Sequence, residues 1–84
     1  MNRIIEDNIK KKIEFFLDKG YKRTEAFHTA ILLYSQEIET NYHSLEVKRQ
    51  LAKKLEYSES MGQEIQKLVN VGKIIRECNL NFSF

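Results

Sequence analysis

The chain of 84 residues carries 14 Lys and Arg against 12 Asp and Glu, with one Cys, three Gly and no Pro or Trp. This length accommodates one domain, so we treat residues 1–84 as a single unit. One cysteine excludes an internal disulfide framework, two separated histidines exclude a self-contained zinc module, and isolated glycines exclude a glycine-rich phosphate loop. A hydrophobic share of 42% indicates a small folded domain instead of a disordered polymer.

The first predicted helix runs from Ile4 to Lys19. Apolar residues recur along it at helical spacing, which places them on one face. They are Ile5, Ile9, Ile13, Phe16 and Leu17. Gly20 follows, and glycine is the residue that most often ends a helix by adopting a left-handed conformation.

A second helix is expected to begin after Thr24 as its N-cap. Its main apolar stripe repeats every three or four residues and consists of Phe27, Ala30, Ile31, Tyr34 and Ile38. Ala26 and Leu33 widen the stripe, so we expect this helix to contact neighbours on two sides and to be central to the domain. The polar stretch 39–43 breaks the pattern.

Two further helices are predicted in the second half of the chain. Ser44 is expected to cap a third helix, whose apolar edge holds Leu45, Leu51, Ala52 and Leu55. Ser60 and Gln63 have the spacing of a capping box, which predicts a restart there after a short junction at residues 58–62. The fourth helix would carry Ile65, Leu68, Val69, Gly72, Ile75 and Cys78, with Val71 and Ile74 on a broadened face.

Residues 79–84 alternate apolar and polar side chains and are expected to form a short extended tail. The predicted fold is therefore all-α, a small bundle of three or four helices with a C-terminal tail. Because Gly72 costs about 1 kcal/mol relative to alanine inside a helix, we expect another helix to approach closely there.

No catalytic site is predicted. None of the serines lies in a strained or glycine-rich turn, and Cys78 lies on the apolar face, where a thiol is usually a small core residue. His28 is expected to be a partly exposed packing residue, and a metal site would need His28, His43 and Cys78 to come together from distant segments. We expect a protein that is not an enzyme and has no metal and no cofactor.

Several features favour a protein partner. Tyr42 and His43 lie in a polar turn, where a helix-capping role is the simpler interpretation and a contact with a partner the alternative. The apolar faces of the second and fourth helices are wider than one stripe, and the tail adds more apolar groups. The expected partner-binding residues are Tyr42, His43, Lys48, Arg49, Lys53, Lys54, Leu80, Phe82 and Phe84. Self-association would use the same surfaces and stays an alternative.

The basic residues of the third helix permit a second interpretation. Lys48, Arg49, Lys53 and Lys54 could belong to a recognition helix that contacts phosphates and bases. A net charge of only +2 and the neighbouring acidic residues favour an ordinary solvated face instead. DNA binding is therefore the less favoured alternative.

The N-terminal sequence carries acidic residues where a signal peptide needs an apolar stretch, and the longest apolar run is residues 30–34. We therefore expect no direct membrane insertion. A lone cysteine is compatible with a reducing compartment, which makes the cytoplasm the expected location.

The opening residues 1–7 (MNRIIED), the segment 15–21 (FFLDKGY) and the central segment 41–51 (NYHSLEVKRQL) resemble small early proteins of T-even-type bacteriophages. Among these, the chain is most similar along its whole length to the cytoplasmic antiholins of lysis inhibition. The resemblance implies a non-enzymatic regulator in the host cytoplasm that binds the cytoplasmic segment of the phage holin and delays lysis. A phage inhibitor of a host protein is a further alternative.

Overall fold

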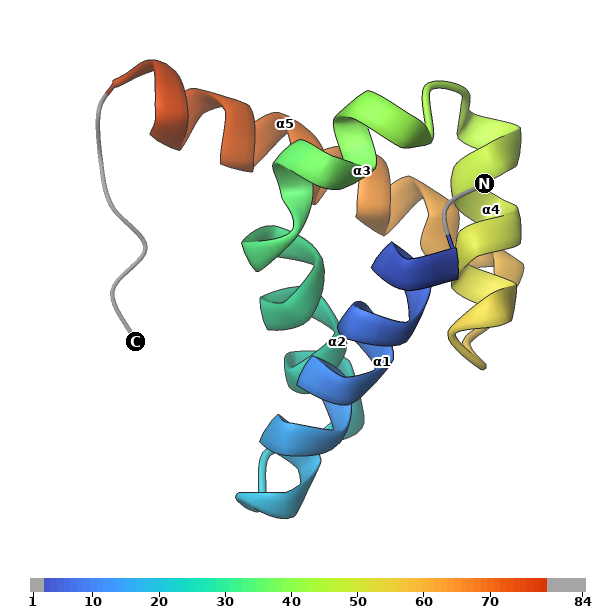
Figure 1. Cartoon of the computed structure of the whole chain (residues 1–84), viewed down its shortest axis with the longest axis vertical. Coiled ribbons are helices and arrows are strands. Elements are labelled where there is room, and N and C mark those ends of the chain that lie inside the picture. The colour runs from blue at the N-terminus through green and yellow to red at the C-terminus, as the bar shows by residue number, and fades with distance from the viewer. Residues whose placement is uncertain (1–2, 79–84) are drawn as a thin grey trace.

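The computed structural model describes residues 3–78, which form five α-helices and one 3₁₀ turn without any strand (Figure 1). The elements are α1 (Arg3–Asp18), α2 (Arg23–Leu33), α3 (Ser35–Asn41), α4 (Leu45–Lys54), η1 (Glu59–Met61) and α5 (Gly62–Glu77). The predicted all-α class is confirmed, but the bundle has more helices than the three or four expected. The predicted tail, residues 79–84, lies outside the described residues.

The additional helix arises at Tyr34. The single helix predicted through Ile38 is divided there, because Tyr34 has the non-helical angles φ −101° and ψ 19°. The chain then resumes as α3 and continues to Asn41, beyond the predicted break. The start of α2 also differs from the prediction: the backbone N–H of Lys22 donates to the carboxylate of Glu25 at 3.1 Å, so the helix begins before Thr24.

Local capping explains where α4 and α5 begin. The prediction for Ser44 is confirmed, because its hydroxyl accepts a hydrogen bond from the N–H of Val47 at 3.1 Å. The capping box predicted between Ser60 and Gln63 is wrong. Ser58 instead accepts from the N–H of Ser60 at 3.3 Å and starts η1, which leads directly into α5 at Gly62.

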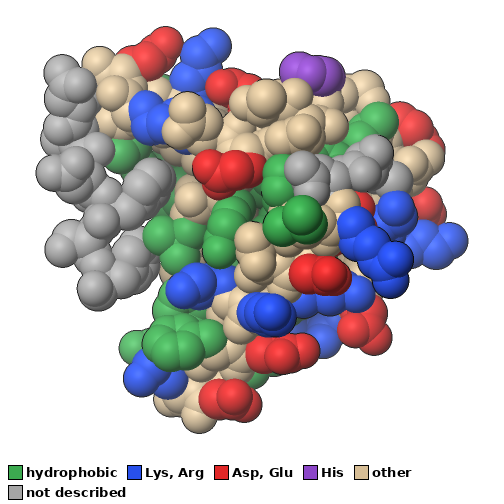
Figure 2. Space-filling model, in the orientation of Figure 1, with side chains coloured by type: hydrophobic (Ala, Val, Ile, Leu, Met, Phe, Trp, Pro, Cys, Tyr) green, Lys and Arg blue, Asp and Glu red, His purple; other side chains and the backbone are tan. Residues whose placement is uncertain are grey.

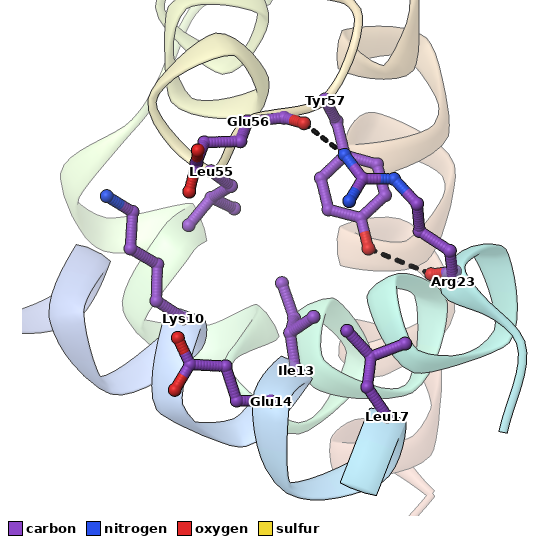
Figure 3. A pocket seen from close by; sticks show the side chains of 8 residues that line it. All are labelled: Lys10, Ile13, Glu14, Leu17, Arg23, Leu55, Glu56 and Tyr57. Carbon is purple, nitrogen blue, oxygen red and sulfur yellow. Dashed lines mark hydrogen bonds between the residues drawn. The ribbon is translucent and has the colours of Figure 1, made fainter. Parts of the chain in front are cut away.

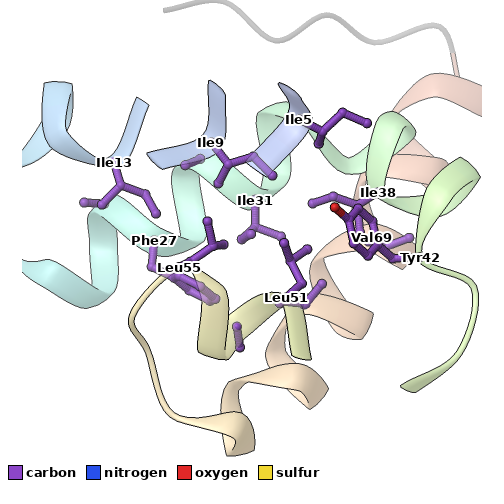
Figure 4. Packing of buried hydrophobic residues seen from close by; sticks show 14 residues of the cluster. Ile5, Ile9, Ile13, Phe27, Ile31, Ile38, Tyr42, Leu51, Leu55 and Val69 are labelled. Atoms are coloured by element: carbon purple, nitrogen blue, oxygen red, sulfur yellow. The ribbon is translucent and has the colours of Figure 1, made fainter. Parts of the chain in front are cut away.

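The hydrophobic core lies between the five helices and takes side chains from each of them (Figure 4). The apolar face predicted for α1 is buried at Ile5, Ile9 and Ile13, whereas Leu17 is 37% exposed. The other elements contribute fully or nearly fully buried side chains: Ala26, Phe27, Ala30, Ile31, Ile38, Tyr42, Leu51, Ala52, Leu55, Ile65 and Val69. Burial of this apolar area is the main source of the fold's stability.

Helix α5 crosses the bundle and packs against α2, α3 and α4. The close approach expected at Gly72 is internal: a Cβ added there would lie 2.6 Å from the Cβ of Ser35 in α3. Gly62 permits a similar approach between α5 and α4, because a Cβ added at residue 62 would lie 2.9 Å from the Cα of Arg49. Helices α1 and α2 run in opposite directions, and the end at which they join projects from the rest of the molecule (Figure 1).

Candidate interaction surfaces

The basic face predicted for α4 is smaller than its sequence indicates. Lys48 is only 2% exposed, and its ammonium group donates to the carbonyl oxygens of Tyr42 at 2.6 Å and His43 at 3.3 Å. Burial lowers the pKa of Lys48, and the nearby Glu39 carboxylate opposes this shift. Lys48 therefore closes the end of α3 from inside the fold and is not part of the exposed surface that was predicted.

The remaining basic residues of α4 are Arg49, Lys53 and Lys54. The Arg49 guanidinium lies 3.6 Å from the carboxylate of Glu46, and the Lys54 ammonium lies 3.6 Å from that of Glu6. Lys53 is exposed. This face therefore offers a nucleic acid fewer unpaired charges than the sequence predicted.

The two predicted contact residues of the turn after α3 differ in exposure. Tyr42 is fully buried and its hydroxyl donates to the Glu6 carboxylate at 3.1 Å, whereas His43 is exposed. The expectation of a surface role for Tyr42 is corrected by this burial. The other three predicted contact residues, Leu80, Phe82 and Phe84, lie outside the described residues.

The outer face of α5 carries uncovered apolar side chains. Val71 is 44% exposed and Ile74 is 58% exposed, one turn apart, while Val69 and Gly72 face the bundle. Cys78, at the C-terminal end of the helix, is also exposed, so the expectation that its thiol is a core residue is wrong. The C-terminal end of α5 extends past the other described helices (Figure 1).

A cavity of about 340 Å³ lies between α1, the start of α2 and the turn after α4. Figure 3 shows Ile13, Leu17 and Leu55 pointing into it, with charged side chains around them. The lining is completed by Lys10, Glu14, Arg23, Glu56 and Tyr57. None of these lining residues is a serine, cysteine or histidine.

The turn beside this cavity has an unusual backbone. Glu56 has a φ of +67°, which is uncommon for any residue other than glycine. The N–H of Glu56 donates to the carbonyl oxygen of Lys53, and that of Tyr57 donates to Ala52, both at 2.9 Å. This is the Schellman arrangement in which helices commonly end, here with glutamate at the position that usually holds glycine.

Within residues 3–78, no group of three or more His, Cys, Asp or Glu side chains is arranged to hold a metal ion. His28 is half-buried beside Phe27, with ring centroids 6.0 Å apart, as the sequence predicted. In the same described part, no helix combines the length and hydrophobicity needed to cross a bilayer.

Comparisons with protein-family models, curated proteins and solved structures give no match to the chain.

Proposed function

We propose that the chain is a non-enzymatic regulator that acts by binding another protein through the outer face of α5. The observation that supports this is the exposure of Val71 and Ile74 on a helix whose opposite face is buried. Val71, Ile74 and Cys78 follow one another at intervals of three and four residues, the spacing at which one helix contacts another. An amphipathic helical segment of the partner is the occupant that this spacing fits.

The charges beside this face suggest what the partner segment carries. Lys67 is paired with Glu64 at 3.8 Å, whereas Lys73 is exposed and forms no ion pair within residues 3–78. An acidic residue beside the apolar positions of the partner helix would complement Lys73 and speed the encounter. The resemblance to cytoplasmic antiholins implies that the partner is the cytoplasmic segment of a phage holin and that the result is a delay of host-cell lysis.

Titration calorimetry with a peptide of a holin cytoplasmic segment tests this proposal. We expect Val71→Ser with Ile74→Ser to weaken binding by roughly tenfold or more, because these side chains would be the apolar anchors. Ile4→Ser is the matched control, since Ile4 is 71% exposed on α1, and it should change the affinity less than about twofold. An unchanged affinity in the double variant would exclude the α5 face.

DNA binding through α4 remains the rival, and Arg49, Lys53 and Lys54 would have to carry it. This hypothesis predicts that the affinity for duplex DNA falls steeply as the salt concentration rises, and that binding is lost when these three residues are changed to glutamine. Lys48 is omitted because its replacement would disturb the end of α3. Inhibition of a host protein would use the same α5 face, and affinity capture with the Ile74→Ser variant as control would identify such a partner.

A further inference from the structure

The end at which α1 and α2 join exposes a row of apolar side chains. Phe15 is 48% and Tyr21 is 56% exposed, with the half-buried Phe16 between them. The ring centroids of Phe15 and Phe16 lie 5.4 Å apart, and those of Phe16 and Tyr21 lie 6.2 Å apart. The three rings therefore form one continuous aromatic row at the projecting end of the molecule (Figure 1).

Lysines surround this aromatic row. The ammonium groups of Lys12 and Lys19 lie 5.3 and 4.9 Å from the centre of the Phe15 ring, within range of a cation–π interaction. Lys11 and Lys22 are exposed nearby, and none of these four lysines forms an ion pair in the described part of the chain. In Figure 2, hydrophobic and basic side chains lie together at this end of the molecule, with acidic side chains beside them.

The local charge is more positive than that of the whole chain. Residues 10–25 contain six basic and three acidic side chains, whereas the entire chain has a net charge of +2. One of those acidic groups, Glu25, accepts a hydrogen bond from the Lys22 N–H at the start of α2. Four of the six basic side chains, Lys11, Lys12, Lys19 and Lys22, belong to the projecting end, whereas Lys10 and Arg23 line the cavity.

We propose that this projecting end binds an anionic membrane surface. Phe15 and Tyr21 enter the headgroup region, and Lys12, Lys19 and Lys22 contact lipid phosphates. Aromatic side chains favour the membrane interface because one part is apolar and another tolerates water, and lysines extend their ammonium groups toward the phosphates. Basic residues beside apolar ones are the combination that holds a protein on an anionic leaflet.

The geometry favours a membrane over the other anionic partners. Stacking of a nucleic-acid base requires an open ring face, but two ammonium groups lie over the Phe15 ring. This end of the helical pair projects outward, which gives a broad and deformable surface free access to it (Figure 1). The site is distinct from the α5 face of the proposed function, so either proposal can fail without the other.

Flotation of the full chain with lipid vesicles tests the inference. We expect binding to vesicles of equimolar phosphatidylglycerol and phosphatidylcholine but not to vesicles of phosphatidylcholine alone. Lys12→Gln with Lys19→Gln should lower the partition coefficient by roughly tenfold or more. Phe15→Ser should lower it by roughly tenfold, because it removes an inserted ring.

Two matched controls locate the effect. Lys53→Gln with Lys54→Gln removes the same two charges from α4, and Ile74→Ser removes an exposed apolar side chain from α5; each should change the partition coefficient less than about twofold. Absence of binding to the anionic vesicles would overturn the inference. Equal loss in the Lys12/Lys19 and Lys53/Lys54 variants would also overturn it, because net charge alone would then explain binding. Circular dichroism of each variant checks that the variant is folded.

Discussion

Arg23 and Tyr57 contact each other in two ways. The guanidinium carbon of Arg23 lies 4.0 Å from the centre of the Tyr57 ring, and the Tyr57 hydroxyl donates to the carbonyl oxygen of Arg23 at 2.9 Å. Arg23 also donates to the carbonyl oxygen of Glu56. These contacts tie the start of α2 to the turn after α4 and form one wall of the cavity in Figure 3.

Removing the Tyr57 hydroxyl tests the strength of this link. Tyr57→Phe keeps the ring against Phe27, at a centroid distance of 4.3 Å, and removes only the hydrogen bond to Arg23. We expect a loss of about 1 kcal/mol in the free energy of unfolding, measured by urea denaturation at neutral pH. A variant as stable as the parent would show that water replaces the hydrogen bond of the Tyr57 hydroxyl at no cost in stability.

Tyr57 should also make stability fall at alkaline pH. Burial raises the pKa of Tyr57 above its ordinary value, and the Arg23 guanidinium opposes this shift. The folded state then holds the phenol proton more tightly than the unfolded state. This contribution to stability is complete below the tyrosine pKa of the unfolded chain, near 10, and is lost as the pH rises through the folded pKa.

Urea midpoints measured from neutral pH to above the tyrosine pKa check this expectation. The Tyr57→Phe variant should lose less stability over the alkaline range than the parent chain. Lys48 acts in the opposite direction, because its lowered pKa makes the folded state release its proton first, but Lys48 is the same in both proteins. Parallel curves for the two proteins would contradict the assignment to Tyr57.

Gly72→Ala should destabilise the fold even though alanine is the better helix former. The added Cβ would lie 2.6 Å from the Cβ of Ser35, so α3 and α5 would have to separate. We expect a net loss of roughly 1–3 kcal/mol by urea denaturation. In a Ser35→Gly background the two closest atoms are gone and the flexible Arg76 guanidinium, 3.3 Å from the added Cβ, is the next neighbour. The same substitution should then be neutral or stabilising by up to about 1 kcal/mol. Equal losses in both backgrounds would argue against the steric cause.

Glu56→Gly should stabilise the chain. Glu56 has a φ of +67°, which glycine adopts without strain, so we expect a gain of roughly 1 kcal/mol in the free energy of unfolding. Gly20→Ala is the reciprocal control: Gly20 has a φ of +95° and open space around it, so its replacement should lose a similar amount through backbone strain alone. If Glu56→Gly stabilised the chain while Gly20→Ala did not destabilise it, the gain would come from removal of the Glu56 side chain and not from relief of backbone strain.

The sequence predicted those features that depend on neighbouring residues. The cap at Ser44, the end of α1 near Gly20 and the apolar face of α1 all follow from local spacing. The burial of Tyr42 also had a signal, because Tyr42 lies four residues after Ile38 and extends the same stripe. The polar residues around it obscured that continuation.

Other features depend on contacts between distant segments. Nothing local marks Tyr34 as the division between α2 and α3, since neither proline nor glycine is there. Lys48 was assigned to the surface as lysines usually are, yet the carbonyl oxygens at the end of α3 draw its ammonium inward. The aromatic row at Phe15 emerged only when the structure placed Lys12 and Lys19 over its ring.

The position of α5 also determines when this chain can fold during synthesis. Helices α1 and α2 can pair as soon as both have left the ribosome, because they are adjacent in sequence. Ile65 and Val69 are fully or almost fully buried in the common core, and both lie late in the chain. A nascent chain that ends before them leaves the apolar faces of α2 and α4 uncovered. The core is therefore complete only after α5 has been synthesised, and a shorter nascent chain exposes apolar surface.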